Sequence, residues 1–462
     1  MQRVGLVEVG QTIIQRCQIF SFEKSKTIHP FKFQCSVMDD TEVTKYLSDD
    51  KEANIITKMF ISLKDEEIKR NNYYLNLVIE DLIKKMKEID DLFAISYKKI
   101  IFCGSFYKNT KVGKPNEFDL NVVLSLPIHP NRINLCSTQP GYVKIQITDS
   151  LPNTNSPKYN VTNTKNQKRL RKFINNGYLN PHQFRSWIEG ILTKANSQLP
   201  LVTKYGTVKL IKIRKSGPAF TLVLNILSQE ENIHVDFVPA LSFERHGIVG
   251  CTINFNEFQK YRNKEWFAIA VAKDIHGNNE DYQWRCSFCY QENEILARNG
   301  RAKVVIRLIK KLRDTQNWHC IASYFIETLF LNKLEELKGI LNNKSITQFF
   351  YLMLKEMHCA FEKHKIEYFW DKNYNLLGRI GKIEMMNISC TLCKIIKNIE
   401  RLAKTETFKI SKYILTANEF ELFQQEYNRR ENIIHIINNE VQDETQDETL
   451  NRVQDKSWCI VS

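Results

Sequence analysis

A helical repeat of apolar residues runs from Glu52 to Phe93, with charged and amide side chains on the opposite face. Apolar positions three and four residues apart fall on one side of an α-helix, so the pattern predicts one long amphipathic helix. The polar pair Asn71-Asn72 is the one point where we expect this helix to break. Its apolar face consists of Ile55, Ile56, Met59, Phe60, Leu63, Leu75, Val78, Ile79, Leu82, Ile83 and Met86.

The hydrophobic periodicity changes after this helix, and the changes divide the chain. Residues 98–290 contain short runs typical of strands, whereas residues 295–430 are mostly helical in pattern. The chain has 462 residues, more than one compact core usually holds. We therefore predict an α+β fold with a mixed-sheet lobe that includes the long helix (46–295), a helical lobe (296–430) and a disordered acidic tail (431–462). Residues 1–45 show no clear period, and their role stays open.

Candidate chemistry begins at Gly104-Ser105, a predicted turn that is followed by a strand with Glu117 and Asp119. Residues two apart in a strand face the same side, so both carboxylates face one pocket while Phe118 faces the core. Paired carboxylates offer the hard oxygen ligands that Mg²⁺ prefers. The glycine lets the backbone approach a phosphate, and the serine adds a hydroxyl donor. This combination is typical of nucleotidyl transfer. The alternative is a turn followed by an edge strand with solvated acids.

A third carboxylate is expected, because phosphoryl transfer with two metal ions usually needs one more acid. The runs Phe220–Ile226 and Asn232–Val238 are β-rich, and the polar residues 228–231 between them predict a hairpin. Asp236 lies inside the second run between two apolar neighbours, where an acid is costly unless it is paired or bound to metal. We interpret Asp236 as the third metal ligand. The alternative is a structural aspartate with a buried arginine partner.

Several motifs follow one another in a fixed order: Gly-Ser-Phe-Tyr (104–107), Lys-Pro-Asn-Glu-Phe-Asp (114–119), Ser-Gly-Pro-Ala-Phe-Thr-Leu (216–222), His-Val-Asp (234–236), Trp-Arg-Cys-Ser-Phe (284–288) and Ala-Ser-Tyr-Phe-Ile-Glu-Thr-Leu (322–329). Together they resemble the cyclic GMP-AMP synthase (cGAS) family, and more closely its insect members, the cGAS-like receptors. The likeness spans roughly residues 50 to 430. It implies a nucleotidyltransferase-fold catalytic lobe, a spine helix that joins two lobes, and a C-terminal helical lobe.

The resemblance also implies roles for individual positions. Glu117, Asp119 and Asp236 match the family's catalytic acids, which bind metal. The positions that match its nucleotide-binding residues are Gly104, Ser105, Arg285, Ser287, Cys289, Glu292, Lys310, Ser323 and Tyr324.

Among these positions, Arg285 matches a contact to the guanine base, and Tyr324 a residue that stacks on a base. Lys310 matches a lysine that neutralises triphosphate charge, with Lys303 or Lys311 as alternatives because the register along that helix is open. Each also has a structural alternative. Arg285 could be a surface cation on a strand, Tyr324 a core aromatic and Lys310 part of a solvated helix face.

The expected cofactor is Mg²⁺, with Mn²⁺ as an alternative, and no zinc is expected. Vertebrate cGAS carries a zinc-binding His/Cys insertion after the Trp-Arg strand, whereas residues 293–309 contain neither His nor Cys. Cys286 and Cys289 lie three apart in a predicted strand and therefore face opposite sides. Cys390 and Cys393 lie in a helical pattern and are typical of small core residues.

The charge of the chain indicates a polyanionic partner. The formal net charge is +14, and the segment from Ile436 to Ser462 holds six acids against two basic residues, which leaves +18 for the rest. Duplex RNA can be recognised by shape and charge alone, and lysines along a helix can follow its phosphates. A solvated helix face would look the same. The candidate RNA-binding residues of the spine helix are Lys58, Lys64, Lys69 and Arg70.

Twelve scattered cysteines, the lack of a signal pattern and the lack of a membrane-length apolar run predict a cytoplasmic location. We therefore predict a cytoplasmic nucleotidyltransferase that double-stranded RNA activates. It would make a cyclic dinucleotide, cyclic GMP-AMP, from ATP and GTP for a downstream receptor in antiviral innate immunity. One alternative is a non-catalytic relative that binds nucleotides or partners, and another is a template-independent RNA nucleotidyltransferase. The three acids and the Gly-Ser turn together favour catalysis.

The last residues, Cys459-Ile460-Val461-Ser462, match a pattern that prenyl transferases read. A chance match is the alternative. A single lipid anchors a protein weakly, and only Arg452 and Lys456 lie upstream among acids. We expect a modified Cys459 and a reversible, partial association with membranes.

Overall fold

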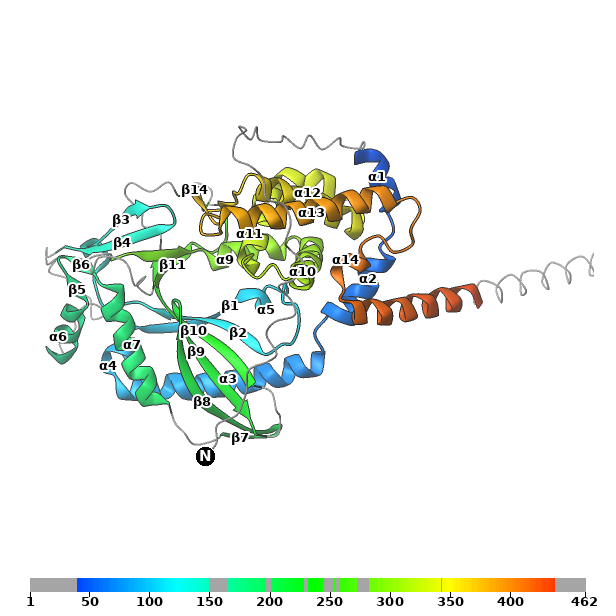
Figure 1. The fold of residues 1–462 in the computed structure, drawn as a ribbon. Coiled ribbons are helices and arrows are strands. Elements are labelled where there is room, and N and C mark those ends of the chain that lie inside the picture. Colours follow the sequence, from blue (N-terminus) through cyan, green and yellow to red (C-terminus); the bar gives the residue numbers. More distant parts are fainter. Residues whose placement is uncertain are drawn as a thin grey trace, which may run out of the picture. The chain divides into compact units, whose positions relative to one another are not determined.

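The computed structural model describes residues 40–148, 164–196, 201–227, 232–244, 253, 258, 260–271, 282–341 and 343–436. Within these ranges twelve strands form one mixed sheet (Figure 1). Nine of them follow the order β5 (Ile174–Asn175), β6 (Tyr178–Leu179), β4 (Tyr142–Ile147), β12 (Trp284–Ser287), β11 (Glu265–Ala270), β10 (Asn232–Glu244), β9 (Ala219–Ile226), β8 (Gly206–Ser216) and β7 (Leu201–Thr203). The other three are β1 (Tyr97–Cys103), β2 (Glu117–Leu124) and β3 (Ile133–Gln139).

Strand β10 organises the part of the sheet that carries the predicted acids. Its first half pairs antiparallel with β9 and its second half with β11, while its other edge runs parallel to β2. The pairing of Asn232 with Asn225 and of Phe237 with Phe220 confirms the predicted β9–β10 hairpin. Strand β2 pairs antiparallel with β1, and β3 with β4.

Both faces of β2 are covered by apolar side chains. Phe118, Leu120 and Val122 are buried in the main core, as their alternation predicts. Helices α3 and α7 lie together against this sheet (Figure 1). Val123 belongs to a second, smaller cluster on the opposite face. This cluster consists of Ile101, Cys103, Val123, Ala240, Phe267, Ile269 and Cys289.

The predicted long helix is broken earlier than expected. The segment consists of α2 (Lys51–Ile56), a π-helical turn η1 (Thr57–Ile61) and, after extended backbone at Ser62 and Lys64, α3 (Asp65–Ile89). The expected break at Asn71-Asn72 is wrong, because both residues lie inside α3. The buried amide of Asn71 donates to the Pro115 carbonyl at 2.9 Å, so its polar group is satisfied within the helix.

The remaining helices of the sheet domain are short or lie at its margins. They are α4 (Asp91–Ser96), α5 (Gly104–Tyr107), η2 (Pro130–Arg132), α6 (Thr164–Lys172) and α7 (Pro181–Ala195). The helical domain follows, with α9 (Cys289–Ala297), α10 (Gly300–Thr315), α11 (Ser323–Leu341), α12 (Ile346–Glu362), the hairpin β13 (Glu367–Tyr368) and β14 (Asp371–Asn375), α13 (Lys382–Leu402) and α14 (Ser411–Ile414).

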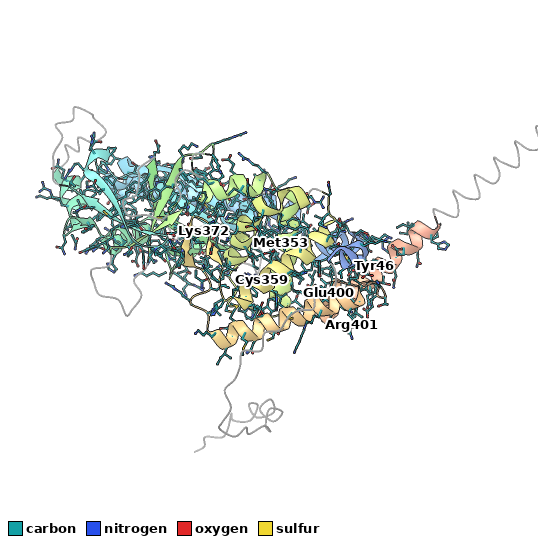
Figure 2. All side chains as sticks on the ribbon, turned by 90° about the horizontal axis from the view of Figure 1, so that it is seen from above. Tyr46, Met353, Cys359, Lys372, Glu400 and Arg401 are labelled. Carbon is teal, nitrogen blue, oxygen red and sulfur yellow. The ribbon has the colours of Figure 1, made fainter. Side chains whose placement is uncertain are left out.

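The first helices of the described chain pack against the helical domain. The buried Glu52 carboxylate of α2 accepts hydrogen bonds from the backbone N–H groups of Lys409, Ile410 and Ser411. Helix α1 (Asp40–Tyr46) lies at the same place: Tyr46 is near Glu400 and Arg401 at the end of α13 (Figure 2), and its carbonyl accepts from Lys409 Nζ at 2.6 Å. The predicted lobe boundaries at 46 and 295 therefore do not separate these helices from the helical domain.

Two further differences concern the C-terminal part. The chain is helical from 417 to 436, so the predicted disordered tail begins inside a helix. Cys390 of α13 is exposed and Cys393 is half-buried, which corrects the expectation that both are core residues. None of the helices in the described ranges is long and apolar enough to cross a membrane. Cys459 and most of the predicted tail lie outside the described residues.

Candidate active site

Two parallel strands bring the predicted acids to one end of the sheet. In the pairing of β2 with β10, Glu117 is opposite His234 and Asp119 is opposite Asp236. Neighbouring strands lie about 4.8 Å apart, and residues two apart face the same side, so these four side chains share one pocket. The pocket has a volume of about 310 Å³ and is lined by Ser105, Lys111, Glu117, Phe118, Asp119, Ser216, Thr221, His234 and Asp236.

Gly104 fits tightly against Asp119. Strand β1 ends at Cys103, which pairs with Asp119, and the chain then turns at Gly104 with φ +73°. A Cβ atom on Gly104 would lie 1.7 Å from Asp119 Oδ2. Only glycine combines this backbone conformation with so close an approach. The sequence predicted that the glycine makes room for a phosphate, whereas the structure shows that it makes room for the Asp119 carboxylate.

Three carboxylates line the pocket, and Lys111 is the lysine that faces them. Burial raises the pKa of Asp119, the nearby Asp236 raises it further, and the Lys111 ammonium opposes both effects. Lys111 forms an ion pair with Glu117, whose side chain is largely exposed. Asp236 Oδ1 accepts a hydrogen bond from the Thr221 hydroxyl at 2.6 Å. Asp119 and Asp236 thus stand as like charges across paired strands.

The donor set suits a hard divalent cation only in part. No group of three or more His, Cys, Asp or Glu side chains is arranged to hold a metal ion in the parts of the chain that the structure describes. Asp119 and Asp236 are nevertheless adjacent, and Glu117 faces the same pocket. Carboxylate oxygens in such a cluster are ligands that Mg²⁺ and Mn²⁺ accept. Of the three, Glu117 is the one that contacts a cationic side chain of the described chain, through the ion pair of its Oε2 with Lys111.

The predicted nucleotide-binding residues beyond the pocket fall into an exposed and a buried group. Arg285 of β12 is exposed and pairs with Tyr142 of β4, and Ser287 is half-buried at the end of the same strand. Cys289 does not lie in a strand as expected but begins α9. Its buried thiol packs in the second cluster, whereas Cys286 belongs to the main core. The two sulfur atoms therefore lie on different faces of the sheet.

Glu292 and Tyr324 are bonded to each other in the interior. Glu292 is 4% exposed, and its Oε1 accepts from Tyr324 Oη at 2.8 Å and from Trp370 Nε1 at 3.2 Å. Its Oε2 lies 3.2 Å from Lys108 Nζ. Burial raises the pKa of Tyr324, and the charge of Glu292 raises it further. In this conformation the carboxylate of Glu292 and the hydroxyl of Tyr324 are hydrogen-bonded to each other.

Lys310 is buried instead of facing the pocket. It is 2% exposed, and its Nζ is 2.6 Å from Glu327 Oε1 and 3.1 Å from the Thr110 carbonyl. Burial lowers its pKa, although Glu327 opposes this effect. The alternative Lys311 pairs with Glu419 at 2.6 Å. The predicted contact of Lys310 with a triphosphate would require the ion pair of Lys310 with Glu327 to open. Ser323 accepts a hydrogen bond from Arg313 Nη1 at 2.9 Å.

The candidate RNA-binding residues surround the bend between α2 and α3. Lys58, Lys64 and Lys69 are exposed, and Arg70 is half-buried. Lys64 Nζ lies 3.6 Å from Glu67 at the surface, a weak contact that an external anion could replace. Because the helix is broken at Ser62–Lys64, these residues flank a corner and do not form one straight row.

Sequence reasoning missed four polar residues of the pocket, one of which is Ser216 at the end of β8. His234 is two residues before Asp236, so the alternation of the strand could have placed it in the pocket. Thr221 is the cross-strand partner of Asp236, which the predicted hairpin could have indicated. Lys111 lies in the loop between the turn and β2, and no local pattern marks its ion pair with Glu117.

Comparison with known proteins agrees with this geometry. Residues 106–298 match the Mab-21 protein nucleotidyltransferase domain, and residues 301–416 match the Mab-21 protein HhH/H2TH-like domain. The first match contains Glu117, Asp119 and Asp236, and the boundary between the two matches falls between α9 and α10.

Three curated relatives carry the same printed name, "Cyclic GMP-AMP synthase-like receptor". The protein of Microplitis demolitor is 35% identical over 78% of this chain and 66% of its own length. That of Trichogramma pretiosum is 33% identical over 82% and 78%, and that of Aethina tumida 35% identical over 78% and 89%. With a nucleotidyltransferase domain, a helical domain and relatives at this level of identity, the chain belongs to the cyclic GMP-AMP synthase-like receptor family.

Proposed function

We propose that this protein is a nucleotidyltransferase that double-stranded RNA activates to make cyclic GMP-AMP from ATP and GTP. The observation that carries the proposal is the pocket in which Ser105, Glu117, Asp119 and Asp236 meet. A turn with a serine hydroxyl beside a carboxylate cluster suits a triphosphate, and the family supports nucleotide substrates. The product would serve a downstream cyclic-dinucleotide receptor in antiviral defence, and we place the protein in the cytoplasm.

The residues of the pocket would divide the work. Ser105 would hold the phosphates by its hydroxyl, and Thr221 holds Asp236 in one orientation through Oδ1. Asp236 would accept the proton of the attacking ribose hydroxyl. Glu117, Asp119 and Asp236 would hold Mg²⁺ or Mn²⁺, which supplies charge neutralisation for the transferred phosphoryl group. Catalysis would then rest on positioning and electrostatics without a covalent intermediate.

Base recognition is proposed for residues that do not line the pocket. Arg285 is exposed and available to a guanine base. In the interior, Glu292 is hydrogen-bonded to Tyr324, and Lys310 is paired with Glu327. The proposed contacts of these three residues with nucleotide therefore require local rearrangement. Ser287, Cys289 and Ser323 stay candidates by position alone.

Double-stranded RNA is proposed as the activator on two grounds. The chain is strongly basic, and three exposed lysines, Lys58, Lys64 and Lys69, lie around the α2–α3 bend. In addition, residues 293–309 contain neither His nor Cys, so we do not expect the zinc-binding insertion of vertebrate cGAS here. A lipid on Cys459 would add a weak, reversible membrane contact.

The test is to incubate the purified protein with labelled ATP and GTP, Mg²⁺ and long duplex RNA, and to resolve the products. We expect a cyclic dinucleotide with RNA and little with duplex DNA. Asp119→Asn and Asp236→Asn remove a carboxylate charge at almost constant shape, and we expect each to abolish product while RNA affinity persists. Synthesis by either variant at the wild-type rate would contradict the assignment of the acids. Binding of nucleotide without any product would instead favour a non-catalytic relative.

A further inference from the structure

A buried cluster of charged residues contacts the loop that follows the Gly104–Tyr107 turn, and the proposed function gives no role to its central residue. Glu327 of α11 is its centre and is 4% exposed. Its Oε1 accepts from Lys310 Nζ at 2.6 Å and from Thr110 Oγ1 at 2.8 Å. Its Oε2 lies 3.1 Å from Lys108 Nζ. All three partners are buried as well.

Two of these partners belong to the loop that carries the turn. Lys108 directly follows α5, and its backbone N–H donates to the Gly104 carbonyl at 3.1 Å. The backbone N–H of Thr110 donates to the Ser105 carbonyl at 2.8 Å. The path from Glu327 to the pocket therefore consists of Thr110 and one backbone hydrogen bond to Ser105.

The turn needs an anchor of this kind. Helix α5 has four residues, too few to be stable by its own hydrogen bonds. A buried carboxylate is costly unless its partners are well placed, so a carboxylate with three donors permits very few arrangements. Glu292 of α9 adds a second contact to Lys108. The helical domain thus holds the loop through Glu327 and Glu292.

We infer that Glu327 is a positioning residue that aligns the Gly104–Ser105 turn with Asp119 through Lys108 and Thr110. The inference rests on the proposed nucleotidyltransferase function. It assigns to the helical domain a part in the catalytic geometry: through Glu327, the domain sets the place of the phosphate-binding hydroxyl.

The test compares Glu327→Gln with Glu52→Gln. Glutamine keeps one oxygen, which can still accept from Lys310 and Thr110. Lys108 then faces the amide NH2 group, which cannot accept a hydrogen bond, or it shares a neutral and therefore weaker acceptor. Glu52 is a matched control, because it is also a buried carboxylate with three hydrogen-bond donors but lies at the other end of the helical domain. We expect kcat to fall about tenfold in Glu327→Gln, with KM changed less than about threefold. In Glu52→Gln both constants should stay near wild type at a temperature where each variant is folded.

A second readout does not depend on activity. Hydrogen–deuterium exchange of peptides that cover residues 104–110 should become faster in Glu327→Gln and stay unchanged in Glu52→Gln. If the wild type makes no product, the proposed function fails, and this exchange still decides whether Glu327 anchors the turn. Unchanged exchange and unchanged kcat in Glu327→Gln would overturn the inference.

Coupling to the turn gives a last check. In a Ser105→Ala background, the loss caused by Glu327→Gln should shrink, since both changes act on the same hydroxyl. Fully additive losses would show that Glu327 acts elsewhere. Should Glu327→Gln fail to fold, Thr110→Val removes only the bridging hydroxyl and should produce a smaller fall in kcat with the same rise in exchange. Wild-type kcat and exchange in Thr110→Val would equally overturn the inference.

Discussion

Substitution of Gly104 by alanine is the sharpest test of the pocket. Two effects add at this position. The first is backbone strain, because φ is +73° and an L-residue pays about 1 kcal/mol in this region. The second is a collision, because the new Cβ atom would lie 1.7 Å from Asp119 Oδ2 and 2.7 Å from Asp119 Cβ. Rotation of the carboxylate relieves only the first contact, so the backbone of β1 or β2 must also shift.

The size of the shift can be worked from the structure. Real Cβ contacts are essentially never closer than 3.0 Å, so the carboxylate oxygen must move by about 1.3 Å from its place at 1.7 Å. A misplacement of about 1 Å in a catalytic group can reduce the rate about 100-fold, which corresponds to about 2.7 kcal/mol in the barrier. We therefore expect a loss of this order in product formation by Gly104→Ala.

Gly177→Ala separates strain from collision. Gly177 has φ +75°, but an added Cβ atom would meet only the Ile147 carbonyl at 3.9 Å, an ordinary contact, in the β5–β6 turn. Gly177→Ala should lose only the stability that strain costs, Gly104→Ala should lose more because of the added collision, and only Gly104→Ala should lose synthesis. The reasoning is refuted if both variants form cyclic dinucleotide at the same rate under matched folding.

Three other predictions follow from separate parts of the molecule. Burial favours the neutral form of Glu327, but the charges of Lys108 and Lys310 outweigh this effect and lower the pKa of Glu327 from about 4.5 to about 2. The stability that the charged carboxylate contributes is therefore complete above pH 4.5 and is lost as the pH falls toward 2. Urea unfolding should show that the stability gap between wild type and Glu327→Gln narrows by about 1 kcal/mol from pH 7 to pH 4, and an equal gap at both values would contradict this. RNA affinity should fall steeply as the salt concentration rises. Both RNA affinity and activation by RNA should weaken when four basic residues are changed to glutamine together. Unchanged activation would show that the α2–α3 bend is not part of the RNA site. These residues are Lys58, Lys64, Lys69 and Arg70. Intact-mass measurement of protein from native cells should find a prenyl group on Cys459, and an unmodified end at Ser462 would exclude it.

Local patterns carried most of the information about the acids. The two-residue spacing of Glu117 and Asp119 and the hairpin around Asp236 depend only on strand periodicity, which neighbouring residues encode. The order of motifs then indicated the family, which the relatives confirm. The amphipathic helix was also recognisable, but its break was misplaced. An asparagine pair resembles a break until the buried amide of Asn71 finds the carbonyl of Pro115, 44 residues away.

By itself, the sequence determined which elements form and which carboxylates share a strand face. Only the tertiary structure decided that Gly104 accommodates Asp119, that Lys108 pairs with Glu327, and that α2 packs on the helical domain through Glu52. The partners in the last two cases come from distant places in the chain: Lys108 and Glu327 are 219 residues apart, and Glu52 and Ser411 are 359 apart. Periodicity reports the side on which a residue lies. The identity of its partner depends on how separate elements pack, because buried charges are stable only where complementary groups from other segments meet them.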